Sequence, residues 1–284
     1  MGIVVTGATG KLGRHVVEQL LEKVPAEQIT AVVRDKARAA DLAERGVQLA
    51  VADYNAPETF AGVFATGDRV LLISGNEFDK GRPAQHKGVI DAAKAAGVAL
   101  LAYTSAPGSL TAALADDHRA TEEILLGSGV PYTLLRNGWY FENYTEHLAP
   151  VLEHGAVVQA AGDGRVSAAS RADYAAAAVA VLTGEGHENK TYELGGDTSF
   201  SFAEYAAELS RQTGREIAYR PVSVEALTGI LTGAGLPEPL AVVFAGVDAS
   251  IAKGELVVPT GDLSRLAGRP TTSLEQAVAD ALKG

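Results

Sequence analysis

Short apolar runs recur along the first half of the chain, and a stretch with helical spacing of apolar residues follows each of them. The runs are nearly continuous instead of alternating, which is typical of parallel strands buried on both faces. They predict strands at Ile3–Thr6, Ile29–Val33, Val47–Ala52, Val70–Ser74, Val98–Thr104 and Tyr132–Arg136. Helices are predicted between them, at about 11–23, 36–45, 57–65, 82–96 and 116–128. Repeated strand–helix units of this kind imply right-handed crossovers and an α/β fold with a doubly wound parallel sheet.

The pattern changes after Arg136, where glycine and proline interrupt the chain more often. Helices are predicted at about 171–183, 201–213, 223–234 and 273–282, with short strands at Val157–Ala160, Thr191–Leu194 and Ile217–Arg220. We therefore expect residues 1–136 to form the sheet domain. Residues 137–284 should form a smaller α+β subdomain that is partly interleaved with the sheet.

The charge and the cysteine content of the chain exclude several classes of binding partner and of chemistry. The formal net charge of −11 argues against nucleic acid or an anionic membrane surface, because both attract basic proteins. The chain has no cysteine, which excludes disulfides, thiolate chemistry and cysteine-ligated metals. No apolar stretch approaches the ~18 residues of a membrane span, and the first residues lead directly into a strand. We expect a cytoplasmic protein without membrane insertion; the oligomeric state, a homodimer included, stays open.

A glycine-rich loop separates the first predicted strand from the first predicted helix. Its residues are Gly7, Ala8, Thr9, Gly10, Lys11, Leu12 and Gly13. Glycine permits positive φ and close approach of a pyrophosphate to the backbone, while a helix N-terminus offers N–H groups and partial positive charge. A tight turn without a ligand is the alternative, but the position after a first strand favours a dinucleotide site. The spacing is G-x-x-G-x-x-G, which differs from the usual G-x-G-x-x-G.

The end of the second strand indicates which dinucleotide binds. Arg34 stands where an acidic residue would accept the ribose 2′-OH of NAD, and its planar guanidinium suits a 2′-phosphate. Asp35 is expected to cap the helix that begins at residue 36. The basic residues Arg34, Lys36 and Arg38 could alternatively be a solvated surface cluster. We expect the cofactor to be NADPH.

Other residues at strand ends should complete the cofactor site. Asp53 could accept a hydrogen bond from the adenine amino group, or it could cap the helix near residue 57. Small or polar residues at the ends of the fourth and fifth strands should lie beside the ribose and pyrophosphate; they are Ile73, Ser74, Gly75 and Thr104. His86, near the start of the next helix, is expected to cap it or to face solvent; the alternative is that it borders the cofactor cleft.

Several segments together resemble a known family. They are Thr6–Gly13, Val33-Arg34, Ala52–Tyr54, Leu71–Ser74, Ala102–Ser105, Tyr132–Tyr140, Ala161–Gly164 and Ser170–Ala178. In this order they resemble the NmrA-like atypical short-chain dehydrogenase/reductase family, and within it the bacterial NADPH:quinone reductases. The resemblance runs over nearly the whole chain and is weakest from about 222 to 270. It implies a Rossmann-like NADP-binding domain, a substrate-side subdomain, and flavin-free two-electron reduction of a small-molecule quinone by NADPH.

The resemblance also assigns residues. It implies that Gly7–Gly13 hold the pyrophosphate and Arg34 the 2′-phosphate. It places the nicotinamide end beside Asn137, Gly138, Trp139, Tyr140, Phe141 and Glu142. Trp139 and Tyr140 would form a wall for a flat substrate, whereas core packing is the preferred alternative for Phe141. Arg171 would reach the cofactor, or it would form a structural ion pair with Asp173 or Glu142.

The catalytic Tyr-x-x-x-Lys of standard short-chain dehydrogenases is missing after the fifth strand. His118 and Glu122 instead occupy positions i and i+4 of the predicted helix and are weak candidates for an acid/base pair. A satisfied polar pair that orients the helix is the alternative. Hydride addition to a quinone gives a stable phenolate, which needs no strong acid, so the catalytic residues stay unknown.

Two alternative functions stay open. One is an NADP(H)-sensing regulator without turnover, and the other is a reductase of another conjugated acceptor such as a dye or enone. The sequence contains no metal-ligand spacing.

Overall fold

The computed structural model describes residues 2–77 and 81–283, which divide into two compact units. Unit 1 contains the chain up to Ala106, Asp117–Asn137 and Arg171–Tyr192. Unit 2 contains Pro107–Asp116, Gly138–Ser170 and the chain from Glu193 onward. The chain thus passes between the units several times, since residues 171–192 of the second half return to unit 1.

A seven-stranded sheet forms the centre of unit 1, in the order β11-β6-β5-β4-β1-β2-β3. Its strands are β1 (Ile3–Val5), β2 (Ile29–Val33), β3 (Gln48–Val51), β4 (Arg69–Leu72), β5 (Leu100–Ser105), β6 (Tyr132–Asn137) and β11 (Lys190–Leu194). All neighbours from β3 to β6 pair in parallel. Because β1 pairs with β2 on one side and β4 on the other, the strand order reverses there. The prediction of a doubly wound α/β sheet is confirmed.

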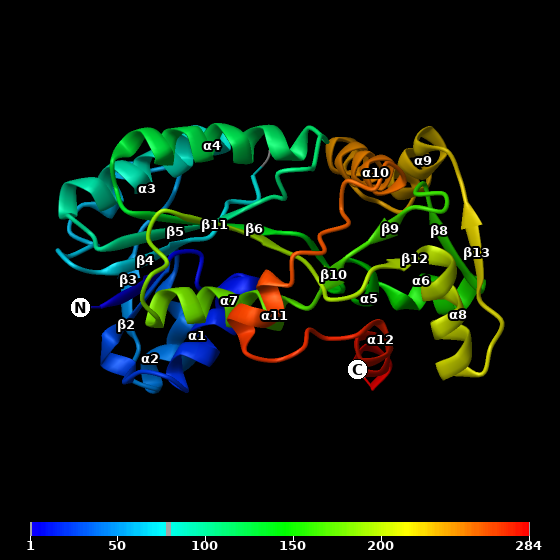
Figure 1. Cartoon of the computed structure of the whole chain (residues 1–284), viewed down its shortest axis with the longest axis horizontal. Helices are drawn as coiled ribbons and strands as arrows, with labels where there is room; N and C mark the ends of the chain where they lie inside the picture. Colours follow the sequence, from blue (N-terminus) through cyan, green and yellow to red (C-terminus); the bar gives the residue numbers. More distant parts are fainter. Residues whose placement is uncertain (1, 78–80, 284) are drawn as a thin grey trace. The chain divides into compact units, whose positions relative to one another are not determined.

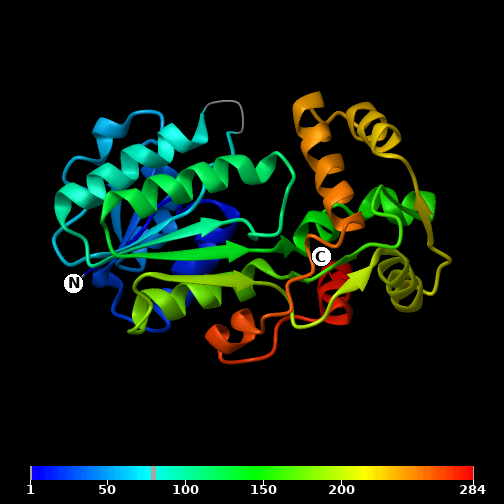
Figure 2. The same cartoon turned by 45° about the horizontal axis from the view of Figure 1, so that its top comes forward.

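Helices cover both faces of this sheet. They are α1 (Lys11–Leu21), α2 (Ala40–Glu44), α3 (Arg82–Ala96), α4 (Leu114–Ser128) and α7 (Arg171–Thr183), with 3₁₀ turns η1 (Ala26–Gln28), η2 (Lys36–Ala39) and η3 (Pro57–Phe60). Figure 1 and Figure 2 show α3 and α4 on one face and α1 and α7 on the other. None of the helices in the described ranges is long and apolar enough to cross a bilayer.

The helix predicted at 57–65 is wrong, since only the 3₁₀ turn η3 forms there. Gly62 has φ +75°, a backbone conformation that ends helical geometry. Phe60 and Phe64 are buried in the core, and their rings stack with centroids 5.9 Å apart. The apolar spacing that resembled a helix therefore belongs to an irregular segment with two buried side chains.

Unit 2 is built from short strand pairs and helices. Its elements are β7 (Trp139–Tyr140), α5 (Glu142–Thr145), α6 (Leu148–His154), β8 (Ala156–Gln159), β9 (Arg165–Val166), β10 (Ala168–Ala169), β12 (Phe200–Ser201), α8 (Phe202–Thr213), β13 (Ala218–Pro221), α9 (Val224–Gly233), α10 (Glu238–Ala252), α11 (Asp262–Ala267) and α12 (Leu274–Lys283). The pairs are β7 with β10, β9 with β12, and β8 with β13. Helix α10 was not predicted; Pro237 and Pro239 belong to the frequent glycine and proline residues of this half of the chain. Proline in the first helical turn is favourable. In α10, Pro237 is the N-cap and Pro239 lies in the first turn.

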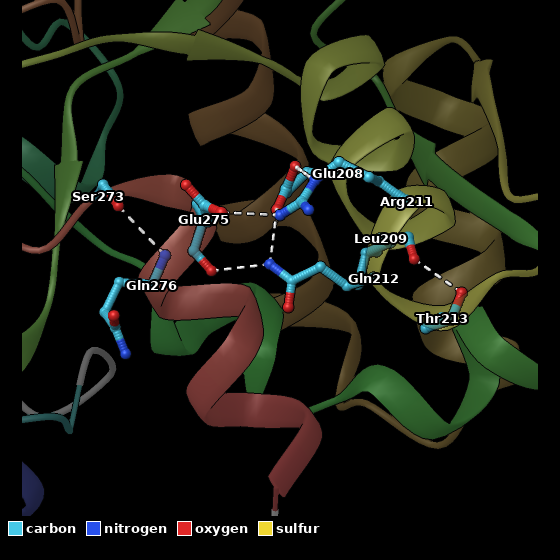
Figure 3. Close-up of polar contacts among 8 residues, drawn as sticks. All are labelled: Glu208, Leu209, Arg211, Gln212, Thr213, Ser273, Glu275 and Gln276. Atoms are coloured by element: carbon cyan, nitrogen blue, oxygen red, sulfur yellow. Dashed lines mark hydrogen bonds and ion pairs between the residues drawn. The ribbon is translucent and has the colours of Figure 1, made fainter.

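Polar contacts join α8 to α12 within unit 2. Arg211 forms an ion pair with Glu208 on its own helix, and its Nη2 also lies 2.9 Å from Oε1 of Glu275 on α12. Gln212 Nε2 donates to the backbone oxygen of Glu275 at 2.8 Å (Figure 3). Because the side chains of Arg211 and Glu275 are largely exposed, their ion pair fixes the register of the two helices more than it adds stability.

A very close backbone approach fixes α1 against the loop after β1. A Cβ on Gly13 would lie 2.8 Å from the Cα of Ala8 and would overlap the carbonyl oxygen of Gly7. Gly7 itself has φ +61°. Only glycine at these positions lets the chain turn and lets α1 bury Val16 and Val17 against the sheet.

A carboxylate is buried in the core of unit 2. Asp248 on α10 is 3% exposed, and its Oδ2 accepts a hydrogen bond from the backbone N–H of Ala160 at 2.6 Å. Burial raises the pKa of Asp248 to about 7, although the Ala160 N–H opposes this shift. The folded state therefore binds this proton more tightly than the unfolded chain does. The stability contribution is full below about pH 4 and is lost as the pH rises through about 7.

We predict that Gly13→Ala lowers the free energy of unfolding by about 3 kcal/mol, because backbone atoms must move to admit the methyl group. Urea unfolding at neutral pH measures the change. Gly127→Ala is the matched control, since Gly127 lies on helix α4 with open space around it, and it should change stability by at most ~1 kcal/mol. Equal effects of the two substitutions would contradict the close-approach argument.

We predict that Asp248→Asn removes part of the pH dependence of stability. Relative to the unmodified protein, the variant should gain about 2–4 kcal/mol between pH ~4 and pH ~8, since asparagine keeps an acceptor for Ala160 N–H but carries no charge. Chemical unfolding across this pH range measures the difference. Asp280→Asn, at an exposed carboxyl that pairs with Lys283, should leave the slope unchanged. A parallel pair of curves for Asp248→Asn and the unmodified protein would refute the prediction.

Candidate functional site

The residues predicted at strand ends gather at one edge of unit 1. Parallel strands end at the same edge. The predicted residues follow β1 (Gly7–Gly13), β2 (Arg34), β3 (Asp53) and β4 (Ile73–Gly75), and Thr104 lies within β5, one residue before its end. In open α/β sheets this edge, at the point where the strand order reverses, is where ligands bind. The structure therefore places these residues together where a dinucleotide could bind.

The glycine loop has the properties of an anion-binding turn. Gly10 is the N-cap of α1, makes no side-chain cap, and no acidic residue stands in the first turn. Gly7, Gly10 and Lys11 are exposed. The side chains of Ala8 and Leu12 point into the core, so these two residues offer only their backbone to a ligand. The positive end of the helix dipole and the exposed glycine backbone suit a pyrophosphate.

Tyr54 supports this edge, a role that the sequence did not reveal. Its hydroxyl donates to the backbone oxygen of Ile73 at 2.7 Å and lies 2.5 Å from Thr6 Oγ1. Thr104, predicted to contact the cofactor, accepts a hydrogen bond from the N–H of Ser74 at 2.9 Å and is 3% exposed. The ends of β1, β3, β4 and β5 are thus held to one another by side chains.

Arg34 lies on the surface at the end of β2. Its side chain is 61% exposed, and its Nη1 lies 3.6 Å from Oε1 of Glu77. Asp35 accepts a hydrogen bond from the N–H of Ala37, so the predicted cap is confirmed. An exposed guanidinium of this kind is available to a phosphate.

Asp53 does not cap the turn at residue 57. Its Oδ1 accepts hydrogen bonds from the backbone and side-chain nitrogens of Asn55, at 2.9 and 3.3 Å. The N-cap of η3 is Ala56, which makes no side-chain bond. The capping alternative is therefore wrong, and contact of Asp53 with adenine stays a prediction.

His86 is buried and contacts Gly75 after β4, so the expectation of a helix cap or an exposed residue is wrong, and the alternative that it borders the cofactor cleft stays a prediction. The N–H of Gly75 donates to its Nε2 at 3.0 Å, so the proton of the neutral ring must lie on Nδ1. That nitrogen therefore donates to Thr121 Oγ1 at 2.9 Å, and Thr121 donates to the oxygen of Asp117. Burial, with the charge of Arg82, lowers the pKa of His86 to about 3.

His118 belongs to the same buried polar region. Arg82 can only donate, so its Nη2 donates to His118 Nε2 at 3.0 Å. The Nδ1–H of His118 then donates to the hydroxyl of Tyr103 at 2.9 Å. Burial, and next the charge of Arg82, holds the pKa of His118 well below its usual value. A neutral, enclosed imidazole of this kind is suited to structure more than to proton donation.

The hydrogen bond that would make His118 and Glu122 an acid/base pair, the weaker of the two alternatives, does not form. Glu122 accepts instead from Ser105 Oγ at 2.6 Å and forms a bidentate pair with Arg136, with distances of 2.9 and 2.6 Å. Both residues face the sheet, where stronger partners from β5, β6 and α3 reach them. The alternative of satisfied polar residues that orient the helix fits these contacts, although each residue has its own partners.

The predicted nicotinamide-end residues fall into both units. Asn137 ends β6 in unit 1 and is 6% exposed, and Arg171, at the start of α7, is 8% exposed. In unit 2, Gly138 donates to the oxygen of Leu194 at 2.7 Å, and Tyr140 and Glu142 are half-buried. Which of them contact a cofactor stays a prediction.

Two aromatic residues of this segment in unit 2 differ in their surroundings. Phe141 is 3% exposed and stacks on Phe200 with ring centroids 5.5 Å apart, so its side chain is part of the core and not of a binding surface. Trp139 is half-buried and meets Phe244 of α10 edge to face, with centroids 6.3 Å apart. An indole edge-on to a partly exposed phenyl ring offers an apolar surface to a flat molecule.

Within the described ranges, no three His, Asp or Glu side chains come together in a group that could hold an ion. The arrangement of unit 1 is instead suited to a phosphorylated organic cofactor.

Comparisons with known proteins agree with this geometry. The profile of the NAD(P)H-binding family matches residues 7–185. Quinone oxidoreductase 2 of Escherichia coli (strain K12) is 45% identical over 279 residues, which cover 98% of this chain and 97% of that protein.

Solved structures extend the likeness. The NADPH-dependent quinone oxidoreductase of Escherichia coli, in complex with NADPH, has a TM-score of 0.95 at 45% identity, with 99% of both chains covered. The triphenylmethane reductase of Citrobacter sp., in complex with NADP(H), has a TM-score of 0.94 at 42% identity, and the match covers 99% of this chain and all of that one. The glycine loop, the parallel sheet and these full-length similarities show that the chain belongs to the NAD(P)H-binding family of oxidoreductases.

Proposed function

We propose that this protein reduces quinones with NADPH, by two-electron transfer without a flavin. The observation that carries the proposal is the 45% identity over almost the entire chain to a quinone oxidoreductase, combined with a matching NADPH-bound fold. The exposed glycine loop and Arg34 at the end of β2 support a phosphorylated dinucleotide in this chain. NADPH, when bound, supplies the hydride for the reduction.

The residues of this chain hold and orient the reactants in the proposed reaction. Gly7–Gly13 would hold the pyrophosphate, Arg34 the 2′-phosphate and Asp53 the adenine, with Ile73–Gly75 beside the ribose. Asn137–Tyr140, Glu142 and Arg171 would border the nicotinamide, and Trp139 and Tyr140 would flank the flat acceptor. Correct placement of reacting groups then accounts for most of the acceleration.

The protein needs no strong acid for this chemistry. A quinone that has gained a hydride is a phenolate, stabilised by its aromatic ring, and water can supply its proton. His118 and Glu122 are engaged in buried contacts with other residues, and the Tyr-x-x-x-Lys pair of alcohol dehydrogenases is absent from the sequence around them. Both features favour a quinone over an ordinary ketone as substrate.

Similarity to a dye reductase supports a second class of electron acceptor. The triphenylmethane reductase of Citrobacter sp. shares 42% identity with this chain, so a conjugated dye cation is a further candidate substrate. A cytoplasmic location is part of the same proposal, and the lack of cysteine is compatible with it.

We predict that the purified protein oxidises NADPH when a simple benzoquinone is added, with loss of the near-ultraviolet absorbance of NADPH. The protein itself should show no flavin absorbance. Measurements without quinone provide the control, and crystal violet tests the dye alternative. NADP⁺ binding without turnover of any quinone or dye would overturn the proposal and favour a regulator that senses NADP(H).

We predict that Arg34→Ala raises the KM for NADPH about ten- to a hundredfold and that for NADH by less than about threefold, because only NADPH carries the 2′-phosphate. Steady-state kinetics with both cofactors measures the two values. Lys23→Ala, which removes a cation at the far end of α1, should leave both unchanged. An equal increase for the two cofactors would exclude the 2′-phosphate role.

A further inference from the structure

A carboxylate stands directly beside the guanidinium to which we assign the 2′-phosphate. Arg34 Nη1 and Glu77 Oε1 are 3.6 Å apart, which is within ion-pair range but longer than a good hydrogen bond. The Arg34 side chain is 61% exposed and that of Glu77 is 26% exposed. The contact is therefore one that an incoming anion could replace at small cost.

Glu77 is held in this position by two amide side chains from different elements. Its Oε2 accepts from Asn55 Nδ2 at 3.0 Å and from Gln85 Nε2 at 3.4 Å. Gln85 also donates to Asn55 Oδ1 at 2.8 Å and is 6% exposed on α3. Oε2 contacts the amides, and Oε1 lies on the side of Arg34. The carboxylate thus cannot turn away from Arg34 without losing these contacts.

We infer that Glu77 is a specificity-determining residue that limits the preference of this site for NADPH over NADH. The inference rests on the proposed role of Arg34. A 2′-phosphate must replace Glu77 as the partner of Arg34, and it meets the negative charge of the carboxylate. A ribose 2′-OH neither has to replace Glu77 nor is repelled by it, since a carboxylate accepts a hydrogen bond from a hydroxyl.

The two side chains divide the task of binding the 2′-substituent. Arg34 has five N–H donors in a planar fork and favours the phosphate, whereas Glu77 accepts only and favours the hydroxyl. An arginine alone would select strongly for NADPH. An arginine paired with a fixed carboxylate accepts both cofactors, with a smaller preference for the phosphorylated one.

The test compares Glu77→Gln with the unmodified protein by calorimetric titration with NADP⁺ and NAD⁺. The variant should bind NADP⁺ about two- to fivefold more tightly, which corresponds to the loss of an exposed ion pair. It should bind NAD⁺ equally well or more weakly, so the ratio of the two affinities rises. Glutamine keeps an acceptor oxygen for Asn55 and Gln85, so the contacts that hold the side chain at position 77 are preserved.

Two controls separate this effect from others. Glu58→Gln removes an exposed carboxylate from η3 in the same unit and should leave the ratio unchanged. Glu77→Gln in an Arg34→Ala background should improve NADP⁺ binding less than it does in the presence of Arg34. If Glu77→Gln unfolds the protein, Glu77→Asp, which withdraws the carboxylate by one methylene, should raise the ratio instead.

An unchanged affinity ratio, or an equal loss for both cofactors, would overturn the inference and leave Glu77 with a purely structural role. Because the titrations need no acceptor, failure of quinone reduction would not affect them. Failure of the Arg34 assignment would appear separately, as equal effects of Arg34→Ala on both cofactors.

Discussion

The close approach of α1 to β1 at Gly13 is the constraint on which unit 1 depends. With no side chain between them, the helix starts directly from the loop, and Val16 and Val17 reach the sheet. The same helix packs against α7, and Gln19 Nε2 donates to the oxygen of Ala172 at 2.9 Å. A helix from the second half of the chain thus completes the face that α1 begins. The turn that could bind a pyrophosphate is therefore also the turn that organises the layer.

On the sheet face covered by α3 and α4, polar side chains are buried and hydrogen-bonded to one another. Arg82, His118, Tyr103, Thr121 and His86 connect α3, α4 and β5 to the loop after β4, and the donors and acceptors allow one arrangement of protons in the two rings. Uncompensated burial of such groups would be costly, so each bond offsets a desolvation penalty. Residues committed to this task are poorly suited to exchange protons with a substrate. On α4, the positions that resemble an acid/base pair in the sequence are thus occupied by residues with structural contacts.

The sheet could be predicted because its strands are continuous apolar runs, a local signal that tertiary contacts reinforce. The glycine loop and Arg34 were also predictable, since their positions follow from strand order. Tyr54, His86 and Glu77 were not recognised, because their partners lie 19, 11 and 43 residues away in sequence (Ile73, Gly75 and Arg34) and only the folded chain brings them together. Helix α10 was missed for a different reason: its prolines resemble the interruptions common in this half of the chain, although a proline in the first turn loses no hydrogen bond. The pairing of His118 with Glu122 failed because helical spacing shows which residues share a face, but not which competing partners lie opposite.

The residues at the carboxyl edge of the sheet differ in the free energy that is lost when a ligand replaces their present partners. Tyr54, Thr104 and His86 hold backbone atoms of the loops, so replacing their partners would disturb the edge itself. Arg34 is instead exposed itself, with a half-buried partner at 3.6 Å, and an ion pair so open to solvent is worth at most ~1 kcal/mol. A ligand that offers two charge-assisted hydrogen bonds gains more than it displaces, whereas one that offers a hydroxyl gains little from Arg34. On the proposed assignment, Arg34 and Glu77 can therefore set the discrimination between cofactors, while the buried contacts keep the geometry in which this pair acts.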